Sequence, residues 1–142
     1  MCDNVLASLG LDPQKARDFV QRALEEDLQW GADVTSLATL PRATATATAN
    51  AREDGVLAGV SLALLAPEIY APGAITVDVL RRDGAQVTGG EPIFTLTGPV
   101  TDILTVERTI LNIVCQLSGV ATHTACLLYT SPSPTRRYAI SY

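Results

Sequence analysis

The sequence predicts an α+β fold in which helices and short antiparallel strands alternate within one domain. Apolar residues recur at helical spacing over residues 16–28 and 101–118. Between these segments, residues 43–51 alternate strictly between alanine and a polar residue, which is the pattern of a strand. Turns at Asp83-Gly84 and Gly89-Gly90 separate further short apolar runs, and such turns favour antiparallel pairing.

The first helix is expected to begin at Pro13, because Asp12 can cap the free amides and proline suits the first helical position. One side of this helix is apolar and is expected to pack on the core up to about Leu28. Its members are Ala16, Phe19, Val20, Ala23 and Leu24. The opposite side is a solvated charged face made by Lys15, Asp18, Arg22, Glu25 and Glu26.

The strand over residues 43–51 carries threonines on one side and alanines on the other. Because alanine is small, another element must approach that side closely; low-complexity sequence is the competing interpretation. A second short strand is expected over residues 56–59, after the turn at 53–55.

Residues 61–70 are mostly apolar and are expected to form a helix that ends before Pro72-Gly73. Residues 75–80 alternate again, as a strand does. Val87 and residues 92–98 are expected to complete a hairpin, with Gly89-Gly90 at its tip.

Residues 101–118 form the longest amphipathic helix, and Gly119 is placed to end it in the left-handed conformation. The aliphatic side chains fall within one wide arc that is expected to be core: Ile103, Leu104, Val106, Ile110, Leu111, Ile113, Val114 and Leu117. The other side carries hydroxyls, amides and one cation, which suits a surface covered by a protein or a ligand. Its members are Thr105, Arg108, Thr109, Asn112 and Gln116.

Arg108 is the charged residue of that polar side, and two roles are open for it. Its planar guanidinium can hold a carboxylate or a phosphate through two parallel hydrogen bonds. It can equally form a structural salt bridge, with Glu107 of a neighbouring chain or with an acid elsewhere. Glu107 itself projects within the apolar arc, where a carboxylate must be paired, so a structural role is expected for it.

The composition excludes several classes of protein. Of the 142 residues, 47% are hydrophobic and 18% are charged, which is typical of a globular domain. A net charge of −5 argues against a nucleic-acid partner or an anionic membrane surface, and no stretch approaches eighteen consecutive apolar residues. An odd number of cysteines without metal-ligand spacing (Cys2, Cys115 and Cys126) predicts reduced thiols in a cytoplasmic protein that lacks a signal peptide.

Five short motifs follow one another along the chain. They are 23–28 (ALEEDL), 30–36 (WGADVTS), 55–59 (GVLAG), 107–112 (ERTILN) and 116–122 (QLSGVAT). Together, over roughly residues 5–125, they resemble the N-terminal domain of quinolinate phosphoribosyltransferase, the carboxylating nicotinate-nucleotide pyrophosphorylase. A molybdenum-locus homologue shares much of this pattern and is the alternative.

The resemblance implies a mixed α/β sandwich, with a mostly antiparallel sheet packed on helices, that lies over a C-terminal α/β barrel. It implies an enzyme that joins quinolinate to phosphoribosyl pyrophosphate with Mg²⁺, releases pyrophosphate and CO₂, and forms nicotinate mononucleotide for NAD synthesis. It also implies a homodimer whose active site is closed by the partner. By position, Arg108 is the arginine that binds the quinolinate carboxylate in the partner subunit's site.

The sequence departs from the family's pattern after residue 126, where neither the barrel nor its Thr-Arg-Lys-Thr motif follows. We therefore expect residues 1–118 to be the N-terminal domain, 119–126 the start of the connection to the barrel, and 127–142 a non-native tail. Alone, such a chain is expected to be inactive, to contain no catalytic residue and to bind no metal. In isolation it would act as a dimerisation domain.

Overall fold

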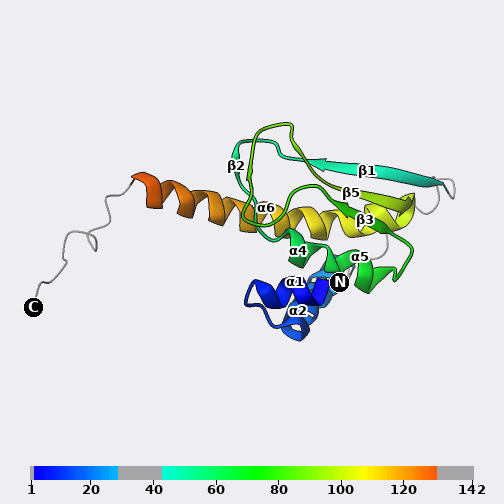
Figure 1. Cartoon of the computed structure of the whole chain (residues 1–142). Helices are drawn as coiled ribbons and strands as arrows, with labels where there is room; N and C mark the ends of the chain where they lie inside the picture. The colour runs from blue at the N-terminus through cyan, green and yellow to red at the C-terminus, as the bar shows by residue number, and fades with distance from the viewer. Residues whose placement is uncertain (1, 29–42, 131–142) are drawn as a thin grey trace, which may run out of the picture.

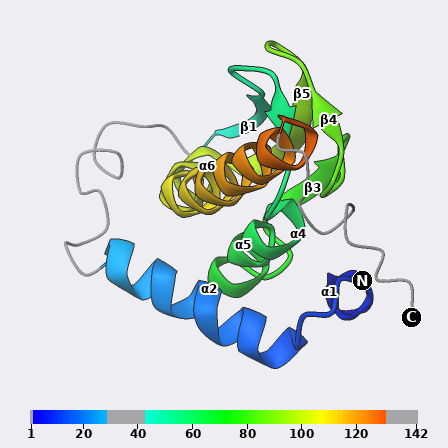
Figure 2. The same cartoon turned by 90° about the vertical axis from the view of Figure 1, so that its left-hand side faces the viewer.

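The computed structural model describes residues 2–28 and 43–130, which are stacked in layers. The long helix α6 (Val100–Thr130) lies between a sheet on one side and the short helices α4 (Val60–Ala63) and α5 (Leu65–Tyr70) on the other (Figures 1 and 2). The outermost layer holds α2 (Pro13–Leu28) and α1 (Cys2–Ser8). This arrangement confirms the α+β class, and no α/β barrel occurs among the described residues. The motif over residues 30–36 and the chain beyond residue 130 lie outside them.

The larger sheet has the strand order β1-β5-β3, with both pairings antiparallel. β1 (Thr44–Asn50) and β3 (Thr76–Val79) confirm two predicted strands, and β5 (Pro92–Pro99) is central. Leu96 is aligned with Ala47 and Val77 and is buried against the helices. The expectation that another element covers the alanines of β1 is wrong for Ala45 and Ala47, which are exposed because β1 is at the edge of the sheet.

The hairpin expected between Val87 and residues 92–98 is wrong. β4 (Gln86–Val87) pairs with β2 (Gly55–Val56) in a separate two-stranded sheet. The link between β1 and β2 also lies beside the link between β4 and β5. There Ala51 accepts a hydrogen bond from the Gly90 amide at 2.7 Å and donates one to the Glu91 carbonyl at 2.9 Å. The glycine pair is therefore a turn within one long segment and not the tip of a hairpin.

α2 begins at Pro13 as predicted, and the Asp12 carboxylate accepts a hydrogen bond from the Gln14 amide at 2.9 Å. Ala16, Val20 and Leu24 are buried. Phe19, expected in the core, is 49% exposed instead. α2 belongs to the outermost layer, so neighbouring helices cover only one narrow stripe of it (Figure 2).

The helix predicted over residues 61–70 is present as two shorter helices, α4 and α5. Pro67 explains the break, because it has no N–H to donate to the carbonyl of Ala63. The start of α4 is capped from a distant turn. Asp83 accepts hydrogen bonds from the amides of Val60 at 2.7 Å and Ser61 at 3.0 Å.

α6 does not end at Gly119, as its position had predicted, but continues to Thr130. Gly119 is not among the residues with positive φ, and a glycine inside a helix costs only about 1 kcal/mol. Hydroxyls on either side of it anchor the helix to the segment around β2. Ser118 Oγ accepts a hydrogen bond from the Ala58 amide at 3.0 Å, and Thr122 Oγ1 accepts one from the Val56 amide at 2.9 Å.

By length and composition alone, α6 is apolar enough over Val100–Leu128 to cross a membrane. Its first half, however, is a core helix, since Val106, Ile110 and Val114 are buried between the sheet and α4–α5. Only 17% of the most apolar stretch of α6 is buried. That the chain has no membrane partner therefore stays a prediction.

Candidate functional site

The predicted site residue Arg108 borders a hollow between α6 and the end of α2. The hollow has a volume of ≈ 380 Å³. Its lining comes from two elements far apart in sequence: Ala23, Glu26 and Asp27 from α2, and Arg108, Thr109, Asn112 and Ile113 from α6. Polar and charged groups therefore gather where the two helices meet.

Thr109 anchors this junction from the inside. It is 1% exposed and is the buried polar residue of the described part of the chain. Its hydroxyl donates a hydrogen bond of 2.5 Å to Asp27 Oδ2. A buried hydroxyl without a partner is costly, so this bond fixes the position of the Asp27 carboxylate relative to α6.

Arg108 lies on the outer side of the same junction. Its side chain is 86% exposed, and its Nε atom is 3.6 Å from Asp27 Oδ1. That separation is long for a hydrogen bond, so the contact is an exposed ion pair. The structural salt bridge considered for Arg108 thus exists within the chain, with Asp27 as the acid elsewhere. A weak contact at one nitrogen leaves most of the guanidinium open to a ligand.

The core arc predicted for this helix was too wide on one side. Leu104 and Leu111 are 42% and 39% exposed and flank Arg108, whereas Thr109, placed on the polar side, is buried. The expectation that Glu107 is buried is also wrong, because it is exposed. The sheet and α4–α5 cover only the side centred on Val106 and Ile110, so the aliphatic residues beyond it remain uncovered. Leu117, also expected in the core, is 38% exposed, although it lies on the same side of α6 as Val106 and Ile110.

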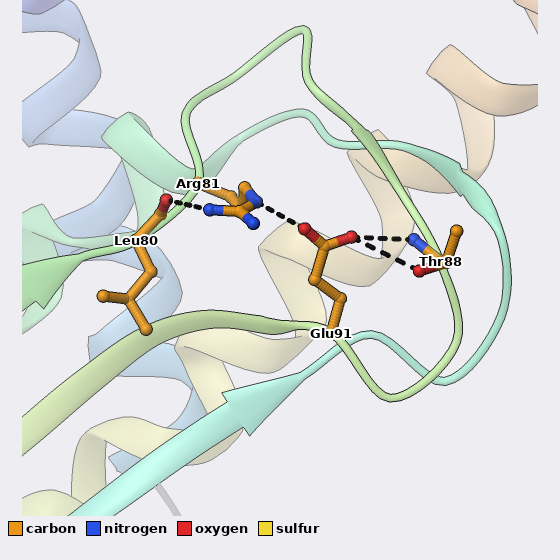
Figure 3. Close-up of polar contacts among 4 residues, drawn as sticks. All are labelled: Leu80, Arg81, Thr88 and Glu91. Atoms are coloured by element: carbon orange, nitrogen blue, oxygen red, sulfur yellow. Dashed lines mark hydrogen bonds and ion pairs between the residues drawn. The ribbon is translucent and has the colours of Figure 1, made fainter.

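A second polar cluster joins the turn between β4 and β5 to the segment that follows β3 (Figure 3). Glu91 accepts a hydrogen bond of 2.5 Å from Arg81 Nε and one of 3.0 Å from the Thr88 amide. The bond from the Thr88 amide, followed by that from Arg81, lowers the pKa of the Glu91 carboxyl from its usual value of 4.5. Thr88 belongs to the same turn as Glu91, and Arg81 comes from the segment after β3, so this cluster holds two loops together and is structural.

Acidification is expected to remove the contribution of Glu91 to stability. Because its pKa is lowered in the folded chain, that contribution is present above the unfolded pKa and is lost as pH falls through the folded value. Glu91→Gln should therefore be less stable than the parent chain near pH 7, and the difference should shrink toward acidic pH. Urea midpoints measured across this range test the expectation. Glu53→Gln is the control. A difference in urea midpoint between Glu91→Gln and the parent chain that does not change with pH would contradict the expectation.

The sequence of residues 33–118 matches the family described as "Quinolinate phosphoribosyl transferase, N-terminal domain". That match includes Arg108, Thr109 and the whole β-sheet region. The chain therefore belongs to the quinolinate phosphoribosyl transferase family. The family inferred from the five short motifs is thereby confirmed.

Relatives in this family are longer than the present chain. The "Nicotinate-nucleotide pyrophosphorylase [carboxylating]" of Mycobacterium leprae is 44% identical over 111 residues, which are 77% of this chain and 39% of the relative. A probable enzyme of the same name from Methanothermobacter thermautotrophicus is 37% identical over 112 residues, 78% of this chain and 39% of that protein. The chain thus spans about two fifths of these relatives.

Solved structures of the family have the same fold. "NadC" from Streptococcus pyogenes superposes with a TM-score of 0.78 at 30% identity, over 84% of this chain and 43% of that one. The nicotinate-nucleotide pyrophosphorylase from Francisella tularensis superposes with a TM-score of 0.74 at 34% identity, over 80% of this chain and 40% of that one.

Asp27 and Thr109 are the site residues whose role sequence reasoning missed. Both lie within motifs that carried the family resemblance, but neither motif shows that they touch. Their contact joins residues 82 positions apart, and only the packing of α2 on α6 reveals it.

Proposed function

We propose that this chain is the N-terminal domain of an enzyme that transfers phosphoribosyl from phosphoribosyl pyrophosphate to quinolinate with decarboxylation. The products are nicotinate mononucleotide, pyrophosphate and CO₂, and the role is in NAD biosynthesis. The names of the relatives support this proposal over the molybdenum-locus alternative. Besides the nicotinate-nucleotide pyrophosphorylases, they include a "Quinolinate phosphoribosyltransferase [decarboxylating] 2, mitochondrial" from Nicotiana glauca, 34% identical over 109 residues.

One observation carries the proposal at the level of the site: Arg108 presents an exposed guanidinium that, among the described residues, has one long contact on its Nε side. Quinolinate is a dicarboxylate, and a planar pair of N–H donors is suited to bind one of its carboxylates. Loss of CO₂ leaves negative charge on the ring, and a cation aimed at the site stabilises that charge as it develops. Arg108 therefore binds substrate, and the residues that transform it are expected in the barrel.

The surface around Arg108 supports a homodimer. Leu104 and Leu111 are exposed on either side of it, and Asn112 and Gln116 continue the face without charge. Burying these leucines against a second subunit would remove apolar area from water and place Arg108 at that subunit's site. We assign the assembled enzyme to the cytoplasm, although relatives in Oryza sativa and Arabidopsis thaliana are named chloroplastic.

Mg²⁺ is proposed for the longer enzyme only. Within residues 2–28 and 43–130, no group of three His, Cys, Asp or Glu side chains could hold a metal ion.

A chimera tests the proposed function. Residues 1–126 would replace the matching N-terminal part of the Mycobacterium leprae relative, and quinolinate-dependent release of pyrophosphate from phosphoribosyl pyrophosphate would be measured. We expect the chimera to be active and the 142-residue chain alone to be inactive. Arg108→Ala should lower kcat/KM for quinolinate by about 10- to 100-fold, the cost of losing hydrogen bonds to a charged group.

Two further variants sharpen this test. Arg108→Lys keeps the charge but not the planar pair of donors, so an intermediate loss is expected. Arg82→Ala removes an exposed arginine elsewhere and should leave kcat/KM unchanged. An Arg108→Ala chimera with full activity would refute the assignment of Arg108 to the substrate.

A further inference from the structure

Asp27 contacts two consecutive residues of α6 through different oxygens. Oδ2 accepts the 2.5 Å hydrogen bond from Thr109, and Oδ1 lies 3.6 Å from Arg108 Nε. One carboxylate near the end of α2 thus joins the buried anchor to the exposed cation.

Exposure rises in steps along this chain of contacts. Thr109 is 1% exposed, the Asp27 side chain 25% and the Arg108 side chain 86%. A long exposed arginine samples many rotamers, which costs free energy when a ligand fixes it. A carboxylate that is itself held from the core can bias such a side chain toward one orientation without fixing it completely.

We propose that Asp27 is a positioning residue for Arg108, a role that rests on the substrate-binding function proposed above. Asp27 holds the Nε side of the guanidinium. The two terminal nitrogens are thereby directed away from α2, where they form parallel hydrogen bonds to a carboxylate of the substrate. Thr109 acts one step further back, by holding the carboxylate of Asp27.

The alternative is that the Asp27–Arg108 ion pair only stabilises the packing of α2 on α6, and this explains the arrangement less well than positioning does. The Thr109–Asp27 hydrogen bond already connects α2 to α6, and an exposed ion pair adds little stability to it. Charge alone also predicts the opposite effect on the ligand. An acid beside Arg108 weakens its attraction for an anion, so removing that acid should improve binding unless orientation matters more.

NMR of the 142-residue chain tests the positioning directly, through the Nε–Hε resonance of Arg108. In Asp27→Asn we expect the chemical shift of this resonance to move toward that of an unpaired arginine. We also expect the Arg108 side chain to become more mobile, while the backbone amide spectrum is otherwise retained. Thr109→Val removes the hydroxyl and should produce the same change. Thr109→Ser keeps the hydroxyl and should show the resonance of the parent chain.

Two references exclude a general effect of charge or folding. Glu26→Gln removes an acid that lines the same hollow but does not pair with Arg108, so the Arg108 resonance should stay in place. Arg81, whose Nε donates to Glu91, should be unaffected in every variant. A resonance that is the same in the parent chain and Asp27→Asn, or that moves equally in Glu26→Gln, would overturn the proposal.

The chimera provides the functional measurement. Asp27→Asn should raise KM for quinolinate by up to about fivefold, the scale of one exposed ion pair, with little change in kcat. A lower KM would show that charge outweighs orientation and would overturn the proposal. If the parent chimera is inactive, the proposed function fails, and the resonance of Arg108 alone then decides whether Asp27 positions it.

Discussion

Gly59→Ala is expected to lower the free energy of unfolding by about 2–5 kcal/mol. Gly59 precedes α4 with φ of 85°, a left-handed conformation that costs a residue with a side chain about 1–2 kcal/mol. An added Cβ would also lie 2.5 Å from Leu117 Cδ1 and 3.1 Å from Leu117 Cβ. Overpacking of this kind costs about 1–3 kcal/mol more. Urea denaturation followed by circular dichroism measures the loss.

Gly84→Ala is the matched control. Gly84 has the same φ of 85°, but nothing lies within 4 Å of the position of its Cβ. It should therefore show the backbone cost alone, and the difference between the two variants gives the cost of crowding Leu117. Adding Leu117→Ala to Gly59→Ala should recover much of that difference. Equal losses for the two glycines would show that α6 does not press against this segment.

Contacts between α6 and the segment just before Gly59 also explain why α6 continues past its predicted end. Local sequence favours a stop at Gly119, where a helix commonly ends. What prolongs the helix is distant: Ser118 and Thr122 bind the backbone of Ala58 and Val56. A pattern of propensities along the chain does not contain that information.

The same division holds for the rest of the fold. Features set by neighbours in sequence were predicted correctly, such as the Asp12 cap of α2 and the presence of a strand at β1. Features set by partners were not. β4 pairs with β2, which is distant in sequence, and the exposure of Phe19 depends on how many layers cover α2.

At the site, sequence reasoning identified the exposed cation but not its support. Arg108 stands out as the single charge on a polar helix face. Asp27, by contrast, belongs to a run of three acids on the first helix, where any of them would be expected to face solvent. Only the structure distinguishes Asp27 from its neighbours, through its bond to Thr109.

Ile110→Ala is expected to lower the free energy of unfolding by about 2–5 kcal/mol, because it removes a large side chain that is 1% exposed and leaves a cavity. Ile110 belongs to the core cluster formed where the sheet, α6 and α4–α5 meet. The measurement is the urea midpoint with its slope, since a change in slope would report a different unfolding reaction.

Leu111→Ala, one position along the same helix, is the test of which side of α6 is core. A helical projection assigns both residues to one apolar arc, whereas in the structure Leu111 is 39% exposed beside Arg108. The cost of Leu111→Ala should therefore stay under about 1 kcal/mol in the isolated chain. In the dimeric chimera the same substitution should weaken subunit association, because this leucine would then be at the interface. A large loss of stability for Leu111→Ala in the isolated chain would instead return it to the core and remove the apolar surface on which the proposed dimer depends.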